Sequence, residues 1–387
     1  MPLIESIARG AEDLTAWRRE FHRHPELGFE LPATIERVLG LLTSFGITDI
    51  ATGVGRSGIV AVIDGQASGR SIGLRADMDA LPIAEQTGLP YASTIAGRMH
   101  ACGHDGHTTM LLGAARHLAA TRNFPGRAVL IFQPAEEAGA GGQVMVKDGL
   151  IERFGIEEVY ALHNYPGQAT GTFAVRPGAI MAAADEFTIT IEGAGGHAAW
   201  PHNTIDPVVV AGQLIGALQT LVSRNTDPLD ASVVSVTQLH CGSAWNIIPS
   251  SAVLNGTVRT LNEALRDRLE ARLSHLVEGI AASFGARAVV AYHRGYPATI
   301  NTPEHARVSA ATAAAVVGTE NVDGDARPTM GGEDFSYMLQ RCPGAYALIG
   351  NGPSAELHSA TFDFNDEILP VGASYFASLV ERRHLAS

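Results

Sequence analysis

Short runs of apolar and β-branched residues alternate with helical stretches through the first half of this chain. The apolar runs cover 58–63, 71–75, 128–132 and 158–162, and stretches of helical spacing cover 5–22, 32–45, 108–120 and 142–149. Strands that alternate with helices at this pace are typical of a layered protein in which helices cover a central sheet. We therefore expect an α/β fold.

The pattern changes near residue 184. Residues 186–192 alternate apolar and polar side chains, which suits a strand with one solvated face. Helical stretches follow at 206–223 and 262–284, with strands at 232–238, 252–260 and 287–293, and a last helix at 370–383. The β-α-β-β-α-β order predicts a compact two-layer α+β domain of ferredoxin-like type. Because 387 residues exceed what one core usually supports, we expect two domains, one of residues 1–183 and 296–387 and an inserted one of 184–295.

Net charge and cysteine content exclude some classes of function and favour one cellular compartment. With 27 basic and 40 acidic residues the net charge is −13, which argues against nucleic acid or an anionic membrane as partner. The odd set Cys102, Cys241 and Cys342 is no disulfide framework and favours a reducing compartment. We see no signal peptide and expect a cytoplasmic protein. The apolar run 207–222 carries two Gln residues, falls short of a membrane span, and predicts a buried helix instead.

The densest chemical signal is MHACGHDGH at residues 99–107. Cys102 and His104 are two positions apart, so in extended chain their side chains point the same way and could reach one divalent ion. The alternative is a histidine-rich loop ahead of a helix that begins near Asp105. Ligand chemistry favours the metal site.

A second signal, FQPAEEAG at residues 132–139, directly follows a predicted strand. Open α/β sheets keep their active sites at the carboxyl ends of strands. Glu136 and Glu137 face different directions, so one could hold a metal while the other takes a proton from water. Taken alone, a solvated acidic pair at a helix start is the more common arrangement.

The segment LRADMDALP at residues 74–82 also ends an apolar strand. Asp77 and Asp79 lie on one side of extended chain, and either could orient a ligand histidine; a plain turn is the alternative. His163 ends the strand 158–162, and His358 follows a loop rich in Gly and Pro. A lone His is more often structural, but these acidic pairs and His163 all end strands of one expected sheet.

Together these residues resemble the metal-dependent aminoacylase and carboxypeptidase superfamily, peptidase family M20, within it the hippurate hydrolase and auxin-conjugate amidohydrolase branch. The matching segments are RADMDALP, GRMHACGHDGHTTMLLGAA, LIFQPAEEAGAGG, ALHNYPG, GAGGHAAWPHNTIDP, WNIIPSSAVLNGTVRT, MGGEDFSYM and LHSATFDFNDEIL. The resemblance implies a mixed-sheet catalytic domain of the dinuclear-metal exopeptidase type and an inserted lid domain that usually dimerises.

The resemblance also implies a set of site residues. The metal ligands would be Cys102, His104, Glu137, His163 and His358. Glu136 would be the general base on a water between two ions, supported by Asp79. A bridging thiolate from Cys102 would favour Zn²⁺, Mn²⁺, Co²⁺ or Ni²⁺ over Mg²⁺.

Further residues are implied in and beside the inserted domain. His197 would polarise the scissile carbonyl, often from a partner subunit, whereas the structural alternative is a turn residue. Asn246 and Arg259 would grip the substrate carboxylate, for which a guanidinium is suited; the alternative for Arg259 is a surface salt bridge. Gly332, in a glycine-rich turn, would line the pocket.

The resulting prediction is a metal-dependent amidohydrolase that cleaves N-acyl-L-amino acids into a carboxylic acid and a free amino acid. We expect two divalent metal ions, a small-molecule substrate, no nucleic acid or membrane partner, and a homodimer or higher homo-oligomer. Three alternatives stay open: a dipeptidase or carboxypeptidase of the same fold, a cysteine hydrolase with Cys102 as nucleophile, and a non-catalytic N-acyl-amino-acid binder. The sequence does not fix the acyl group.

Overall fold

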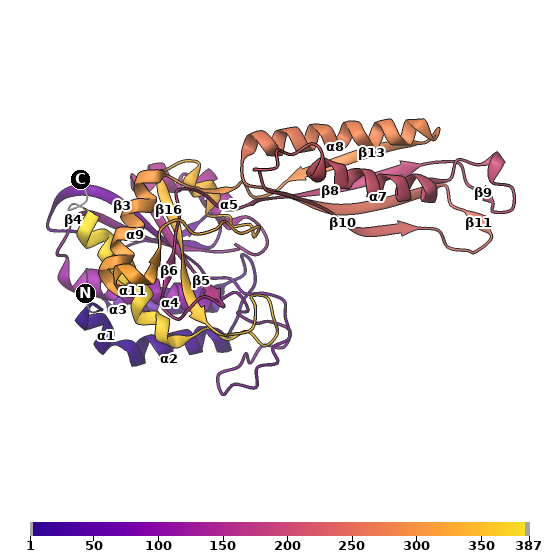
Figure 1. Cartoon of the computed structure of the whole chain (residues 1–387). Coiled ribbons are helices and arrows are strands. Elements are labelled where there is room, and N and C mark those ends of the chain that lie inside the picture. Colours follow the sequence, from indigo (N-terminus) through magenta and orange to yellow (C-terminus); the bar gives the residue numbers. More distant parts are fainter. Residues whose placement is uncertain (1–2, 384–387) are drawn as a thin grey trace. The chain divides into compact units, whose positions relative to one another are not determined.

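The computed structural model describes residues 3–383, which form two compact units. The first unit comprises residues 3–180, 300–327 and 334–383, and the second comprises 181–299 and 328–333. Figure 1 shows the helices and strands of each unit. Among residues 3–383, no helix is long and apolar enough to cross a membrane.

The first unit contains an eight-stranded mixed sheet in the order β1-β2-β4-β3-β5-β16-β6-β15. These strands are β1 (Asp49–Val54), β2 (Gly58–Asp64), β3 (Ala67–Asp77), β4 (Pro125–Gln133), β5 (Glu158–Pro166), β6 (Phe173–Ala174), β15 (Val322–Asp323) and β16 (Gly344–Gly352). β3 runs parallel to β4 and to β5, and β5 runs parallel to β16. The almost continuous burial of β4, β5, β16 and the second half of β3 is that of strands covered on both faces.

Helices cover this sheet. They are α1 (Glu5–Arg9), α2 (Ala11–Arg23), α3 (Pro32–Ser44), α4 (His104–Thr121), α5 (Gly141–Lys147), α6 (Leu150–Phe154), α9 (Pro303–Val317), α10 (Ser336–Leu339) and α11 (Leu369–Arg382). The central helix α4 packs against α2 and α11. The prediction of one helix over 5–22 was wrong, because Gly10, packed closely against Arg116, separates α1 from α2.

The second unit confirms the predicted β-α-β-β-α-β order. Its elements are β8 (Ala183–Glu192), α7 (Pro207–Ser223), β10 (Ser232–Cys241), β12 (Ser251–Thr260), α8 (Glu263–Ser283) and β13 (Arg287–Arg294). The antiparallel sheet has the order β10-β12-β8-β13, and a small hairpin pairs β9 (Gly196–His197) with β11 (Ile247–Ile248). Two short strands, β7 (Gly178–Met181) and β14 (Thr299–Asn301), lie where the chain passes between units. A lid or dimerisation role for this unit stays a prediction.

Local sequence sets the helix starts in this unit. The Asp206 carboxylate accepts the Val208 N–H (2.9 Å) and Pro207 occupies the first turn of α7. The expectation that α7 is buried was wrong on one face: Val208 and Val209 are 41% and 49% exposed. A helix on a two-layer domain buries only the side that meets the sheet, since the same unit has no third layer to cover the other.

Candidate metal centre

Four of the five predicted ligands lie near the carboxyl ends of β4 and β5 and at the start of α4, and the fifth, His358, lies in the segment after β16. β3 ends at Asp77, β4 ends at Gln133 just before the Glu136–Glu137 pair, and β5 carries His163. Because these three strands are parallel, their carboxyl ends meet at one edge of the sheet. The edge therefore brings together segments that are up to 86 residues apart in the chain.

Among the described residues, five overlapping groups of side chains have ligand atoms within 4.8 Å of one another, and three of them consist only of predicted ligands and the predicted base. These three are Cys102 with His104 and His163, Cys102 with Glu137 and His358, and His104 with Glu136 and Glu137. All five predicted metal ligands and the predicted base thus lie together, and Cys102 belongs to two of the groups. Two ligands bound at about 2.1 Å to a tetrahedral ion lie roughly 3.4 Å apart, which is the scale of this cluster.

The hydrogen bonds of two histidines leave their Nε2 atoms facing the cluster. His104 Nδ1 donates to the Asp79 carbonyl (2.8 Å), and His163 Nδ1 donates to the Asn164 carbonyl (2.7 Å). A carbonyl can only accept, so Nδ1 carries a proton and Nε2 is the nitrogen left to bind a metal. His163 Nε2 lies 3.4 Å from Cys102 Sγ. This is the tautomer that metal-binding histidines adopt.

Two buried atoms of the cluster have no hydrogen-bond partner among residues 3–383: His104 Nε2 and Glu137 Oε1. They lie 3.8 Å from each other, and His358 Nε2 is 3.3 Å from the same Glu137 oxygen. Buried polar groups are normally satisfied, and a cation between these lone pairs would satisfy them. The donor set therefore fits a divalent metal.

The site has the electrostatics of a cation-binding pocket. Burial disfavours a charged His104, yet Asp77, Asp79 and Glu137 raise its pKa to about 10. Burial, reinforced by Glu137 and Glu136, raises the pKa of the Cys102 thiol well above its usual range. A bound metal would reverse that shift, because a coordinated thiol loses its proton.

Asp79 fixes the turn that carries the two glutamates. Its Oδ1 accepts the Glu136 N–H (2.9 Å) and its Oδ2 accepts the Glu137 N–H (3.2 Å). The preceding residue, Ala135, takes a left-handed conformation with φ 55°, which a non-glycine residue adopts only under external constraint. Glu136 is only 7% exposed, so the alternative of a solvated acidic pair is excluded.

The predicted substrate-binding residues of the second unit lie in two places. His197 stacks on Trp200 (ring centroids 4.6 Å apart), and the Asn246 carbonyl accepts the Ala198 N–H (3.0 Å), so His197 and Asn246 are near neighbours across the small hairpin. Arg259, half-buried on β12, donates to Thr257 Oγ1 and to the Val258 carbonyl. Gly332 lies in a turn beside Ala184. Their roles stay predictions.

A second buried network supports the histidine-rich segment and was missed from the sequence. His22 Nδ1 donates to Asp105 (2.8 Å), and Arg18 lies 3.6 Å from the same carboxylate and bonds Asp366 (2.6 Å). Asp105 directly follows His104, so this network holds the first turn of α4. No local signal in α2 could have revealed it, because the partners are more than 60 residues away.

The His22 network predicts a pH-dependent contribution to stability. Burial opposes protonation, but hydrogen bonds to Asp105 and Glu85 raise the His22 pKa to about 9. A raised pKa gives stability that is fully present below pH 6.5 and is lost as pH rises toward 9, about 1.4 kcal/mol per pKa unit. The urea midpoint of His22→Gln should therefore lie below wild type at pH 6 and approach it at pH 9.5.

The exposed His202 provides the control for this comparison. The His202→Gln variant should keep a constant offset from wild type across the same pH range. A pH-independent difference for His22→Gln would contradict the assignment of a protonated His22.

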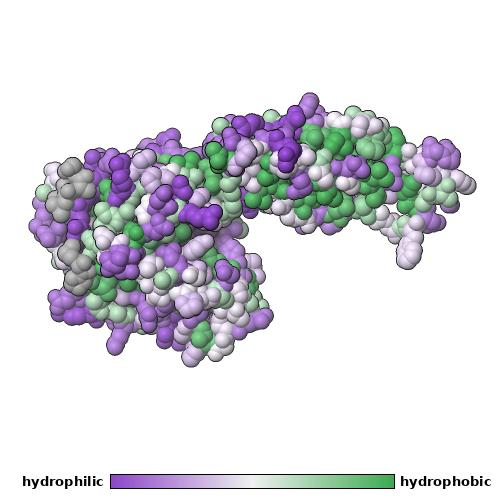
Figure 2. All heavy atoms as spheres, viewed as in Figure 1, coloured by the Kyte–Doolittle hydropathy of each residue, from purple (hydrophilic) through white to green (hydrophobic). Residues whose placement is uncertain are grey.

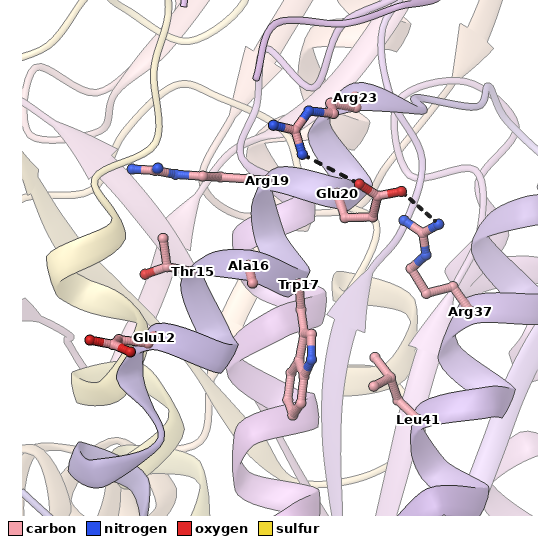
Figure 3. Close-up of a pocket in the computed structure, with 9 residues that line it drawn as sticks. All are labelled: Glu12, Thr15, Ala16, Trp17, Arg19, Glu20, Arg23, Arg37 and Leu41. Carbon is pink, nitrogen blue, oxygen red and sulfur yellow. Dashed lines mark hydrogen bonds and ion pairs between the residues drawn. The ribbon is translucent and has the colours of Figure 1, made fainter. Parts of the chain in front are cut away.

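A surface groove of about 620 Å³ lies between α2 and α3 and is shown in Figure 3. Trp17 and Leu41 line it together with three arginines. Glu20 pairs with Arg23 (3.4 Å) and with Arg37 (3.0 Å), and Arg19 pairs with Asp366 (2.8 Å), so each arginine of the groove already has a carboxylate partner. None of the predicted site residues lines this groove, and it offers no ligand set comparable to the metal cluster.

Known proteins are similar to this chain over most of its length. The profile of Peptidase family M20/M25/M40 matches residues 73–382. An N-acetyl-L-cysteine deacetylase of Bacillus subtilis (strain 168) is 42% identical over 377 residues, covering 97% of this chain and 89% of the relative. A hippurate hydrolase of Campylobacter jejuni is 39% identical over 379 residues, covering 98% of each chain.

A solved structure from Bacillus subtilis, described as a dinuclear metal binding peptidase from the M20 family, is also similar. It superposes with a TM-score of 0.87 at 34% sequence identity, and the match covers 98% of this chain and all of the other. The similarity extends over the whole described chain rather than over the metal segment alone.

Proposed function

This chain belongs to peptidase family M20/M25/M40 and is a hydrolase of amide bonds, and on that premise we propose that it removes the acyl group from small N-acyl-L-amino acids. The products are a carboxylic acid and a free amino acid. The observation that carries the proposal is the convergence of two overlapping ligand groups with a buried carboxylate, Glu136, beside them. The deacetylase and hippurate hydrolase names of its relatives support the N-acyl substrate class.

The enzyme uses two divalent metal ions. In our proposal Cys102, His104, Glu137, His163 and His358 hold them. When bound, the ions polarise the amide carbonyl and make a water acidic enough to deprotonate near neutral pH. The cysteine thiolate favours Zn²⁺, Mn²⁺, Co²⁺ or Ni²⁺ over Mg²⁺.

Glu136 is the proposed general base. Its carboxylate takes a proton from the attacking water and later returns it to the leaving nitrogen. Asp79 holds the two N–H groups of the Glu136–Glu137 turn and so fixes the direction of both carboxylates. Burial limits competing contact between Glu136 and bulk water.

The residues of the second unit complete the proposal. His197 would stabilise the negative charge that develops on the carbonyl oxygen. Arg259 and Asn246 would bind the substrate carboxylate, and Gly332 would line the pocket. Burial lowers the pKa of Arg259, and a carboxylate ligand would offset that cost.

Three alternatives are less well supported. A cysteine hydrolase needs a thiolate, whereas burial and two neighbouring glutamates keep the Cys102 thiol protonated without a metal. A pure binding protein has no use for a buried base beside the ligand cluster. The substrate of a dipeptidase or carboxypeptidase differs from an N-acyl amino acid only on the acyl side of the amide bond, so an experiment must distinguish this alternative from the proposal.

That experiment is a hydrolysis panel on the purified protein. N-acetyl-, N-benzoyl- and indoleacetyl-amino acids are compared with dipeptides, and release of free amino acid is measured. We expect kcat/KM for the best N-acyl amino acid to exceed that for every dipeptide by tenfold or more. A dipeptide as best substrate would replace the proposal with the peptidase alternative, and no turnover by the metal-loaded protein would favour the binding protein.

We also propose that the protein forms a homodimer through α7 of the second unit. This helix carries no charged residue, and its outer face presents Val208, Val209, Gly212 and Gly216 to solvent. Figure 2 shows hydrophobic and near-neutral residues on the surface of this part of the chain. The two glycines would let the helix of a second subunit approach closely, and an interface would remove the exposed valines from water.

Replacing Gly212 by Arg should convert the dimer to a monomer. Nothing lies within 4 Å of a Cβ added at Gly212, so the fold of the unit should persist. Gly279→Arg on α8 is the matched control, since Gly279 is equally open and exposed. Light scattering after size exclusion measures the mass; a monomeric wild type would remove this proposal and a cross-subunit role of His197.

We also propose that the protein is located in the cytoplasm. All three cysteines are free, which is consistent with a reducing compartment. Burial alone would slow the oxidation of Cys102 and Cys342, so this observation supports the location only weakly for those two. The net charge of −13 gives no support to a nucleic-acid partner.

A further inference from the structure

His107 lies inside the metal cluster but has no place in the proposed ligand set. It is fully buried, and both of its ring nitrogens are engaged. Nδ1 lies 2.6 Å from Asp77 Oδ1, and Nε2 lies 3.1 Å from the Asn164 backbone nitrogen and 2.7 Å from Asn164 Oδ1. His107 therefore cannot bind a metal without giving up one of these bonds.

His107 connects the segments that carry two proposed ligands. It lies one turn after His104 on α4, and its ring is centred 4.4 Å from the ring of His163. Asn164 is held from both sides: its N–H donates to His107 Nε2, and its carbonyl accepts His163 Nδ1–H. The residue whose carbonyl orients His163 is therefore in direct contact with His107.

Asp77 is in turn fixed from behind the cluster. Its Oδ2 accepts from Arg75 Nη1 (2.7 Å), and its carbonyl accepts from Thr108 Oγ1 (2.7 Å). Arg75 is also bonded to Gln133 (2.9 Å) and Asp334 (3.1 Å), so one buried guanidinium connects β3, the end of β4 and the segment just before α10. Asp77, His104 and His107 have the spacing of a metal site, but both Asp77 oxygens already accept strong hydrogen bonds.

We propose that His107 is a positioning residue that holds His163 Nε2 toward Cys102 and so sets the affinity of one of the two metal ions. The inference rests on the proposed ligands. It distinguishes the two ligand groups. In the group of Cys102, His104 and His163, both histidine rings contact His107; in the group of Cys102, Glu137 and His358, no member forms a hydrogen bond or ring contact with His107 in the described part of the chain. Loss of His107 should weaken one metal equivalent and spare the other.

The test compares His107→Phe and His107→Asn with wild type. Phe keeps the ring volume but has no hydrogen-bonding nitrogen, and Asn keeps a donor that can reach Asp77. Bound metal is counted after dialysis, and dissociation constants for Co²⁺ come from chelator competition followed by the visible spectrum. We expect one equivalent to bind about 10- to 100-fold more weakly in His107→Phe, with partial recovery in His107→Asn.

His100→Gln is the matched control. His100 lies in the same histidine-rich segment and is equally buried, but neither ring nitrogen has a hydrogen-bond partner among residues 3–383. This variant should bind two equivalents as tightly as wild type. If His107→Phe does not fold, the comparison of His107→Asn with His100→Gln carries the test.

The outcomes separate this inference from the proposed function. Two wild-type-like equivalents in folded His107 variants, or equal weakening of both equivalents, would overturn the positioning role while leaving the two-metal enzyme intact. A wild-type protein that binds no metal would instead overturn the proposed site itself.

Discussion

Glu136→Gln is expected to lower kcat by about 10²- to 10⁴-fold while both metal ions stay bound. The amide cannot accept a proton from water, but it has nearly the shape of the carboxylate. The backbone N–H bonds to Asp79 that hold the turn are unaffected by the change. Turnover of the best N-acyl amino acid and metal content by elemental analysis are measured on the same preparation.

The neighbouring Glu137→Gln provides the opposite pattern. Glu137 Oε1 lies 3.3 Å from His358 Nε2 and belongs to the ligand group, so this variant should lose metal first and activity as a consequence. Added metal should then restore part of its activity but none of the activity of Glu136→Gln. Wild-type turnover by Glu136→Gln would refute its assignment as base.

Chelation is expected to abolish activity completely, and Zn²⁺, Mn²⁺, Co²⁺ or Ni²⁺ should restore it better than Mg²⁺. The cause is the donor set, in which a thiolate and imidazoles bind softer ions more strongly than an oxygen-preferring ion. Removal of metal should also lower the unfolding temperature, because binding to the folded state stabilises it by about 2.7 kcal/mol at a hundredfold excess over Kd. Activity and melting temperature are recorded before chelation, after it, and after each metal is added.

Cysteine variants decide between the metal and thiol mechanisms. Cys102→Ser should weaken metal binding and shift the preference toward oxygen-loving ions, whereas exposed Cys241→Ser should behave as wild type. Activity that survives chelation but is lost in Cys102→Ser would transfer the reaction to a cysteine nucleophile.

The secondary structure of the second unit could be predicted because its signals are local. Strand β12 alternates buried and half-buried residues, as the sequence alternation requires, and Asn262 caps α8 by accepting the Leu265 N–H (2.7 Å). Strand β16 and helix α9 were not placed individually, since their glycine- and alanine-rich sequences carry little periodicity. A run of Gly and Ala becomes a buried strand or helix only when neighbouring elements cover it.

The candidate ligands could be predicted from residue type, but which histidines bind metal and which support the site could not. His100, His104 and His107 lie within eight residues, yet only His104 has a bound Nδ1 and an Nε2 left facing the cluster. The partners that decide this are Asp79, Asp77 and Asn164, which come from other strands. Spacing along the chain carries no information about those partners.

The sequence by itself determined the kinds of ligand, their order, and the alternation that builds two layered units, because side-chain chemistry and hydrophobic period are local properties. Only the tertiary structure decided which nitrogen of each histidine faces the cluster, how Arg75 is held by Gln133 and Asp334 and His22 by Asp105, and that one face of α7 is exposed. These outcomes depend on hydrogen bonds and burial between segments tens to hundreds of residues apart. Parallel strands bring such segments to one edge of a sheet, and no local pattern records which neighbours will meet there.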